Sequence, residues 1–279
     1  MKRIASIQDI SCLGRCSLTV ALPVVSAMGV ECAILPTAVL STHTIFPDFT
    51  CADLSAELLP IADHWKTQQV HLDALYTGYL ASAEQVDDVL AVFDLLAEPD
   101  TLLFVDPAMA DHGKLYPAFG PGFPAHMARV VARADVTVPN ITEACLMTGT
   151  ESREEYDETS IKELLPKVTA LGAKQAVLTG VTFTKDKLGV MAYDSATGEY
   201  FSYFNERVPS AFHGTGDIFS ACTVGGMMRG LTLHEALKLA VDFTLHCIRV
   251  TTADPGHSWY GVEFERAIPY LVERLKTLD

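Results

Sequence analysis

Basic residues are scarce in this sequence, and their scarcity limits the partners that the chain can have. The 279 residues include 20 lysines and arginines against 35 aspartates and glutamates, for a net charge of −15. A strongly acidic chain without a basic cluster attracts neither nucleic acids nor anionic membrane surfaces. We therefore expect no nucleic acid and no membrane as partners. An anionic nucleotide would need local help from backbone amides, a lysine or a metal ion.

The cysteines lack the pattern of a disulfide framework or of a metal site. There are seven, an odd number, and none are spaced as Cys-x-x-Cys. Most lie in apolar runs, as buried free thiols do. The chain has no hydrophobic run long enough to span a membrane, and its first residues lack the apolar stretch of a signal peptide. These absences predict a reducing, cytoplasmic location.

The sequence does contain a regular alternation of buried strands and amphipathic helices. This alternation is typical of a parallel α/β sheet with helices on both faces. Two alternating segments around Ala-Thr-Gly at 196–198 predict an antiparallel hairpin at one edge. With no linker, repeat or low-complexity tract, we expect one domain over residues 1–279. The expected strands are Ile4–Ile10, Glu31–Leu35, Ala74–Tyr79, Leu102–Val105, Val136–Val138, Ala176–Leu178, Leu188–Tyr193 and Glu199–Phe204, and the expected helices are Leu18–Met28, Leu54–Trp65, Ala83–Leu96, Ala125–Ala134, one from about Thr142, Ile161–Leu171, Ile218–Met228, Leu233–Val250 and Phe264–Lys276.

One connection is unusually long for a compact domain. Residues 110–124 are rich in glycine and proline and show no strong periodicity. Long connections of this kind are usually functional loops or lids, so we expect one here. Its Lys114 is long enough to reach a phosphate, but a solvated surface position is the simpler expectation.

The sequence His-Gly-Thr-Gly-Asp at 213–217 stands directly before an expected helix. Two glycines permit a tight turn and a close approach of the backbone to a ligand. Amide groups at a helix start, together with the helix dipole, bind anions. Asp217 would repel a phosphate at rest, but it is explained if it accepts a proton from a hydroxyl group that attacks phosphorus. A plain capping turn without a ligand is the alternative.

Polar residues also lie at or just after the ends of the expected strands. They are Asp9, Ser11, Tyr79, Asp106, Asn140 and Thr179. Each alone fits an ordinary turn, cap or core position. All six fall at the carboxyl edge, where open α/β sheets bind their ligands, so together they favour a site.

The types of these residues narrow the chemistry. Asp106 and Glu143 are carboxylates suited to holding Mg²⁺ through waters, and Asn140 lies one helical turn before Glu143. The amides of Gly214, Thr215 and Gly216 would hold a transferring phosphoryl group while Asp217 deprotonates the acceptor hydroxyl. The sequence has neither a Gly-x-x-x-x-Gly-Lys-[Ser/Thr] loop nor a His-Arg-Asp loop, which excludes P-loop and protein-kinase architectures.

At this point the sequence resembles the pyridoxal kinase group of the ribokinase superfamily over essentially its whole length. The matching segments are Ser-Ile-Gln-Asp at 6–9, Ser-Thr-His-Thr at 41–44, Thr-Gly-Tyr-Leu-Ala-Ser-Ala-Glu-Gln at 77–85, Val-Asp-Pro-Ala-Met at 105–109, Val-Pro-Asn-Ile-Thr-Glu at 138–143 and Gly-Thr-Gly-Asp at 214–217. The last is a hallmark of the superfamily, and the first three point to vitamin B6. The resemblance implies a ribokinase-like three-layer sandwich with a mostly parallel sheet, and ATP-dependent phosphorylation of the 5′-hydroxymethyl group of pyridoxal, pyridoxine or pyridoxamine.

The resemblance also implies residue roles. Asp217 would be the general base, with Gly214, Thr215 and Gly216 as the anion hole. The nucleotide phosphates and Mg²⁺ would be served by Asp106, Asn140, Glu143 and Thr179, and the pyridine pocket would be lined by Asp9, Thr44 and Tyr79, with His43 nearby. Relatives are usually dimers and often need K⁺ as well as Mg²⁺.

The sequence departs from the pyridoxal kinase pattern at Asp9, where a serine is common. An aspartate there can accept a hydrogen bond from a ring hydroxyl or a protonated ring nitrogen, and we expect it to alter the preference among vitamers. Related pyrimidine kinases carry an acidic residue in this region, so a hydroxymethylpyrimidine kinase of thiamin synthesis is the first alternative. A non-catalytic protein that binds B6 or a nucleotide is the second.

Overall fold

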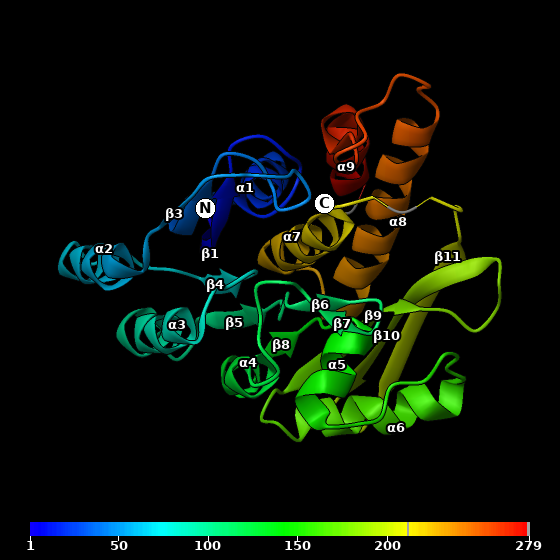
Figure 1. The fold of residues 1–279 in the computed structure, drawn as a ribbon, viewed down its shortest axis with the longest axis horizontal. Helices are drawn as coiled ribbons and strands as arrows, with labels where there is room; N and C mark the ends of the chain where they lie inside the picture. The colour runs from blue at the N-terminus through cyan, green and yellow to red at the C-terminus, as the bar shows by residue number, and fades with distance from the viewer. Residues whose placement is uncertain (211, 278–279) are drawn as a thin grey trace.

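The structure, a computed structural model, describes residues 1–210 and 212–277. Nine strands form one sheet in the order β11-β10-β9-β8-β5-β4-β1-β2-β3, and β6 and β7 form a separate small ribbon (Figure 1). The strands are β1 Arg3–Ser11, β2 Glu31–Leu40, β3 Cys51–Asp53, β4 Ala74–Thr77, β5 Leu102–Val105, β6 Ala110–Asp111, β7 Lys114–Leu115, β8 Val136–Thr137, β9 Gln175–Val181, β10 Lys187–Asp194 and β11 Tyr200–Glu206. The helices are α1 Leu18–Ala27, α2 Ser55–Thr67, α3 Ala83–Leu96, α4 Phe123–Val131, α5 Ile141–Thr148, α6 Glu158–Thr169, α7 Thr215–Met228, α8 Leu233–Thr252 and α9 Ile268–Lys276, with a 3₁₀ turn at Phe264–Ala267.

The middle of the sheet is parallel and its two edges are antiparallel. β2, β1, β4, β5, β8 and β9 pair in parallel. β10 and β11 form the expected hairpin at one edge, and β3 pairs antiparallel with β2 at the other. The predicted α/β class with an antiparallel edge hairpin is therefore confirmed.

Helices cover both faces of the sheet, which gives three layers (Figure 1). One hydrophobic cluster joins the sheet to α2 through α6, and the other joins it to α1, α7, α8 and α9. Successive residues of the central strands point to opposite faces. In β5, Leu103 and Val105 belong to the first cluster, whereas Phe104 belongs to the second. Burial on both faces explains why these strands are apolar throughout rather than alternating.

Several boundaries differ from those that the sequence predicts. The edge strand β3 was not expected, because all three of its residues are exposed and carry no apolar pattern. The connection 110–124 contains the β6–β7 ribbon, which turns through His112 and Gly113, both with positive φ. β9 continues three residues beyond Leu178, and α4 begins at Phe123 rather than Ala125. Pairing and turn geometry, not hydrophobicity, set these ends.

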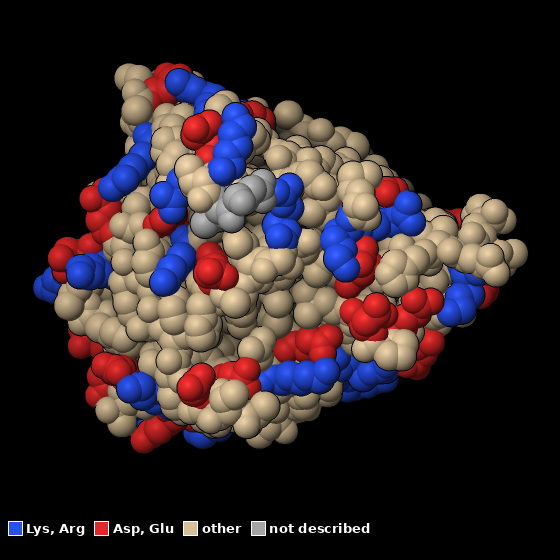
Figure 2. Space-filling view, turned by 180° about the vertical axis from the view of Figure 1, so that it is seen from behind, with Lys and Arg blue, Asp and Glu red and all other residues tan. Residues whose placement is uncertain are grey.

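On the surface, charges of both signs are mixed. Lysine and arginine side chains are interspersed with aspartates and glutamates on the face that Figure 2 shows. Ion pairs join neighbouring elements, such as Arg249 with Glu206 and Arg133 with Asp94. Within residues 1–210 and 212–277, no helix has the length and apolar character needed to cross a membrane.

Candidate functional site

The glycine-rich turn forms the start of α7. Gly214 is the N-cap residue in the left-handed conformation, with φ of 83°, and no side chain caps the helix. A Cβ atom at Gly214 would collide with the carbonyl oxygen of Arg15, so only glycine fits this turn. The absence of a capping side chain argues against a simple capping turn. It leaves the first-turn amides available to an anion.

Asp217 lies in the first turn of α7. The backbone of Ser17 donates a hydrogen bond to its carboxylate. Burial raises the pKa of Asp217 to about 6, the charge of Asp9 adds to the increase, and the bond from Ser17 opposes it. Ser17 has φ of 51°, an unfavourable value for a residue other than glycine. A partly buried carboxyl group with a raised pKa suits a general base.

Asp9 lies in β1, and its side chain is also buried. It accepts a hydrogen bond of 3.1 Å from the hydroxyl of Ser11. Burial raises the pKa of Asp9, while the hydroxyls of Ser17 and Ser11 oppose the increase. Asp9 is close enough to Asp217 and Tyr79 to raise the pKa of each. The structure thus places Asp9, Tyr79 and Asp217 in one region, although 208 positions separate the first from the last.

Tyr79 contributes an aromatic wall beside this region. Its ring centroid is 5.4 Å from that of Phe119 and 6.5 Å from that of Tyr116, both from the connection after β5. Burial, followed by the charge of Asp9, raises the pKa of Tyr79 to about 12, so its hydroxyl stays protonated at neutral pH. Flat rings beside a buried carboxylate suit a flat heteroaromatic ligand that carries hydroxyl or ring-nitrogen groups.

The two predicted metal carboxylates lie close together after β5 and at the start of α5. The Asp106 carboxylate accepts a hydrogen bond of 2.6 Å from the hydroxyl of Ser220 in α7. Burial raises its pKa to about 7, with Ser220 opposing and the charge of Asp217 adding. Burial and Asp106 raise the pKa of Glu143 well above its usual value, against the bonds from backbone amides.

These carboxylates fit a hydrated Mg²⁺. Glu143 already accepts backbone N–H groups of Met109 at 3.0 Å, Ala110 at 3.4 Å and Asn140 at 2.9 Å, so water would mediate its contact with an ion. No group of three or more histidine, cysteine or acidic side chains able to hold a metal occurs among the described residues. A cation here would therefore take its other ligands from water and phosphates, as Mg²⁺ does in kinases.

Asn140, shortly after β8, and Thr179, within the last three residues of β9 rather than beyond its end, lie side by side. The two residues form an isolated parallel bridge. The Asn140 side chain accepts from the amide of Glu143 and donates to the carbonyl of Ala110 at 2.8 Å. Asn140 thereby caps α5 in a capping box with Glu143, and it also links the connection after β5 to α5.

His43 and Thr44 lie in the connection between β2 and β3 and differ in burial. His43 is buried, with 4% of its surface exposed, whereas Thr44 is exposed. Sequence reasoning passed over three positions that complete this region: Ser17, Ser220 and Phe119. Ser17 and Ser220 are ordinary serines in the sequence. Their importance depends on contacts with residues as far as 200 positions away, which no local pattern reveals.

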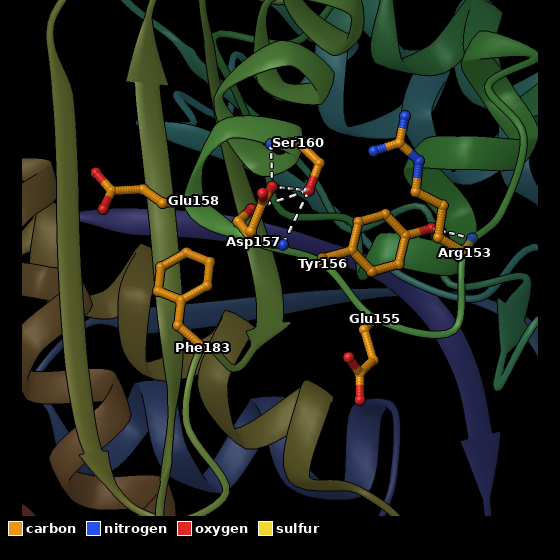
Figure 3. A pocket seen from close by; sticks show the side chains of 7 residues that line it. All are labelled: Arg153, Glu155, Tyr156, Asp157, Glu158, Ser160 and Phe183. Carbon is orange, nitrogen blue, oxygen red and sulfur yellow. Dashed lines mark hydrogen bonds between the residues drawn. The ribbon is translucent and has the colours of Figure 1, made fainter.

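Two surface pockets lie apart from this region. The one in Figure 3, of about 470 Å³, is lined by Arg153, Tyr156, Asp157, Ser160 and Phe183, among others. Figure 3 shows Asp157 and Ser160 bonded to each other, which is the capping box of α6. The other, of about 490 Å³, lies between α2 and α3. Neither pocket includes any predicted site residue, so the carboxyl edge remains the candidate site.

Comparisons with known proteins identify the family of the chain. A family model described as phosphomethylpyrimidine kinase matches residues 22–263. Pyridoxal kinase of Arabidopsis thaliana is 27% identical over 268 residues, which cover 92% of this chain and 85% of that protein.

Two solved structures are similar over nearly the whole chain. One, from Bacteroides thetaiotaomicron, is assigned to the phosphomethylpyrimidine kinases and was crystallised with pyridoxal; it has a TM-score of 0.91 and 34% identity, covering 97% of this chain and 95% of that one. Pyridoxal kinase of Lactobacillus plantarum has a TM-score of 0.90 and 31% identity, covering 99% of each chain. The protein therefore belongs to the phosphomethylpyrimidine kinase family of ribokinase-like enzymes, which includes the pyridoxal kinases that it resembles.

Proposed function

We propose that this protein transfers the γ-phosphoryl group of ATP to the 5′-hydroxymethyl group of a B6 vitamer, pyridoxal, pyridoxine or pyridoxamine. The observation that carries the proposal is the placement of Asp217, a partly buried carboxylate in the uncapped first turn of α7 and near Asp9. The similar structure with pyridoxal and the relatives named as pyridoxal kinases support the same activity.

We assign a role in this reaction to each part of the turn. Asp217 takes the proton of the substrate hydroxyl as its oxygen forms a bond to the γ-phosphorus and the bond to the β-phosphate oxygen breaks, leaving ADP. The first-turn amides that follow Gly214 face the negative charge that develops on the transferring group. Asn140 and Thr179 lie at the neighbouring strand ends and are proposed to contact the nucleotide phosphates.

The ring of the substrate is proposed to lie between Asp9 and the wall of Tyr79. Asp9 then accepts a hydrogen bond from the ring hydroxyl or from a protonated ring nitrogen. Thr44, which is exposed in the neighbouring connection, is proposed as a further contact, and His43 as a residue near the ring.

The proposal extends to cofactors, assembly and location. Asp106 and Glu143 would hold Mg²⁺, which supplies positive charge against the phosphates when it is bound. A K⁺ requirement and a homodimer are part of the proposal through the family resemblance. We also propose that the protein acts as a single domain in the cytoplasm. Its seven free cysteines are compatible with that location.

A hydroxymethylpyrimidine kinase is the second candidate. The observation in its favour is the matching family model, which is described by phosphomethylpyrimidine kinase activity. The same fold, base and anion site would serve a flat pyrimidine alcohol. A non-catalytic binder is disfavoured, because Asp217, the uncapped start of α7 and the pair of carboxyl groups at Asp106 and Glu143 suit phosphoryl transfer.

The test is an ATP-consumption assay with Mg²⁺ and K⁺ across the three vitamers and hydroxymethylpyrimidine. We expect the highest kcat/KM with a vitamer, and mass spectrometry of the product should show one added phosphoryl group. A clear preference for the pyrimidine would move the protein to thiamin synthesis. Tight binding without turnover of any alcohol would instead support the non-catalytic alternative.

A further inference from the structure

His43 stands where four segments of the chain meet. Its backbone N–H donates to the carbonyl of Leu13 at 3.0 Å, in the connection between β1 and α1. Its ring is 2.7 Å from the carbonyl oxygen of Tyr260, in the connection after α8. The ring also stacks on His213, just before the glycine-rich turn, with centroids 5.9 Å apart. Through its backbone and its ring, this one residue therefore contacts segments that are up to 247 positions apart in the sequence.

Both ring nitrogens of His43 are engaged. A carbonyl oxygen only accepts, so Nε2 must carry a hydrogen and donate it to Tyr260. The backbone N–H of Ile45 donates to Nδ1 at 3.3 Å, so Nδ1 must be unprotonated. The two bonds together select the neutral imidazole with its hydrogen on Nε2. In this arrangement no ring nitrogen is free for a proton transfer to or from a substrate.

Two further aromatic side chains pack beside the contact between His43 and Tyr260. The ring of Phe46 lies 5.1 Å from that of His43 and 4.6 Å from that of Trp259. Trp259 is 62% exposed, so it lies at the surface beside the Phe46 ring. On the inner side, Gly14 leaves no room for a side chain, because a Cβ atom there would collide with Cδ2 of His43.

We propose that His43 is a positioning residue that fastens the substrate-side connection, residues 41–46, to the segment at 259–260 by its Nε2–H bond to Tyr260. It holds Thr44 and the neighbouring backbone in place and does not itself exchange a proton with the substrate. The role in catalysis rests on the proposed function, whereas the fastening between the two segments does not and can be measured without activity.

Glutamine and asparagine at position 43 distinguish the role of the ring nitrogen Nε2 from that of Nδ1. In His43→Gln the amide nitrogen replaces Nε2 and still reaches the Tyr260 carbonyl. In His43→Asn the amide oxygen replaces Nδ1, but the side chain is too short for Tyr260. A Trp65→Phe background leaves Trp259 as the sole tryptophan, and acrylamide quenching of its fluorescence then reports whether the 259–260 segment is held.

We expect His43→Asn to raise the KM for the vitamer roughly three- to tenfold, the usual effect of one lost hydrogen bond, with kcat changed less than twofold. Quenching of Trp259 should increase, and His43→Gln should restore both values. Unchanged quenching in His43→Asn would overturn the fastening role whatever the activity. A loss of kcat in His43→Gln equal to that in His43→Asn would show instead that the ring takes part in chemistry.

Gly14→Ala provides a second approach that leaves the histidine in place. The added methyl group should displace the ring, raise Trp259 quenching and raise the KM. Because φ at position 14 is 137°, an alanine there would also strain the backbone. In a His43→Ala background only that strain remains, so Gly14→Ala should then add less to the quenching. Full additivity of the two changes would contradict the proposed contact.

Discussion

Replacing Asp217 with asparagine should make the protein more stable and much less active. Burial raises the pKa of this carboxyl from 3.8 to about 6. That difference corresponds to at most about 3 kcal/mol of cost in keeping the carboxylate ionised in the folded protein. Asparagine has nearly the same shape and never ionises, so it removes this cost. Because the substitution removes the proposed general base, kcat should fall roughly 10²–10⁴-fold.

The pH dependence of the unfolding free energy follows from the direction of the pKa shift of Asp217. Because the folded pKa lies above the unfolded one, the protonated carboxyl contributes stability below about pH 4 that is lost as the pH rises through about 6. Asp217→Asn should therefore unfold several degrees above the parent at pH 8, and at nearly the same temperature at pH 4. Thermal unfolding by circular dichroism, with kcat from a coupled ATP assay, measures both effects.

A suitable control is Asp63→Asn, which removes an exposed carboxylate on α2. It should change neither the unfolding temperature nor kcat beyond the scatter of the measurement. A near-normal kcat in Asp217→Asn would refute the assignment of the base. An equal stability gain at pH 4 and pH 8 would refute the explanation of that gain by ionisation.

Three further predictions concern the surroundings of the base. Gly214→Ala should lower kcat at least 100-fold, because its Cβ atom meets a backbone carbonyl. The control is Gly198→Ala, at another left-handed glycine with open space around it, which should leave kcat unchanged. Equal effects of the two substitutions on kcat would mean that backbone strain alone is responsible. Asp9→Ser should change the ranking of kcat/KM among the vitamers, and a uniform loss would show that Asp9 does not contact the ring. Because burial raises the pKa of Cys16 to about 12, iodoacetamide at pH 8 should modify the exposed Cys12 first, and faster labelling of Cys16 in peptide mass spectra would contradict this.

Much of the fold was predictable because it depends on local periodicity. The central strands are apolar and the helices amphipathic, so the order of elements and the edge hairpin followed from the sequence. β3 did not, since its exposed residues form a strand only by pairing with Val39 and its neighbours in β2. The same applies to the β6–β7 ribbon, which depends on the left-handed turn at His112 and Gly113.

The residues of the candidate site could be grouped by position from the sequence, but their contacts could not be predicted. Parallel strands bring their carboxyl ends to one edge, so Asp9, Asp106 and Asn140 could be grouped from the sequence alone. Their partners could not be found in this way, because each bond depends on how a helix packs across the sheet. Ser220 reaches Asp106 from α7, and the backbone of Ser17 reaches Asp217 from the start of α1.

The strongly acidic composition is compatible with nucleotide chemistry once the charges in the site are considered. Asp9, Asp106, Glu143 and Asp217 are carboxyl groups whose pKa burial raises. Among the described residues, no lysine or arginine forms an ion pair with any of them. Buried carboxylates without cations are costly, so the candidate site suits ligands that carry positive charge. A protonated pyridine ring at Asp9 and a divalent cation at Asp106 would bring that charge. The deficit of basic residues that argues against nucleic acid therefore favours ligands that arrive with their own cations.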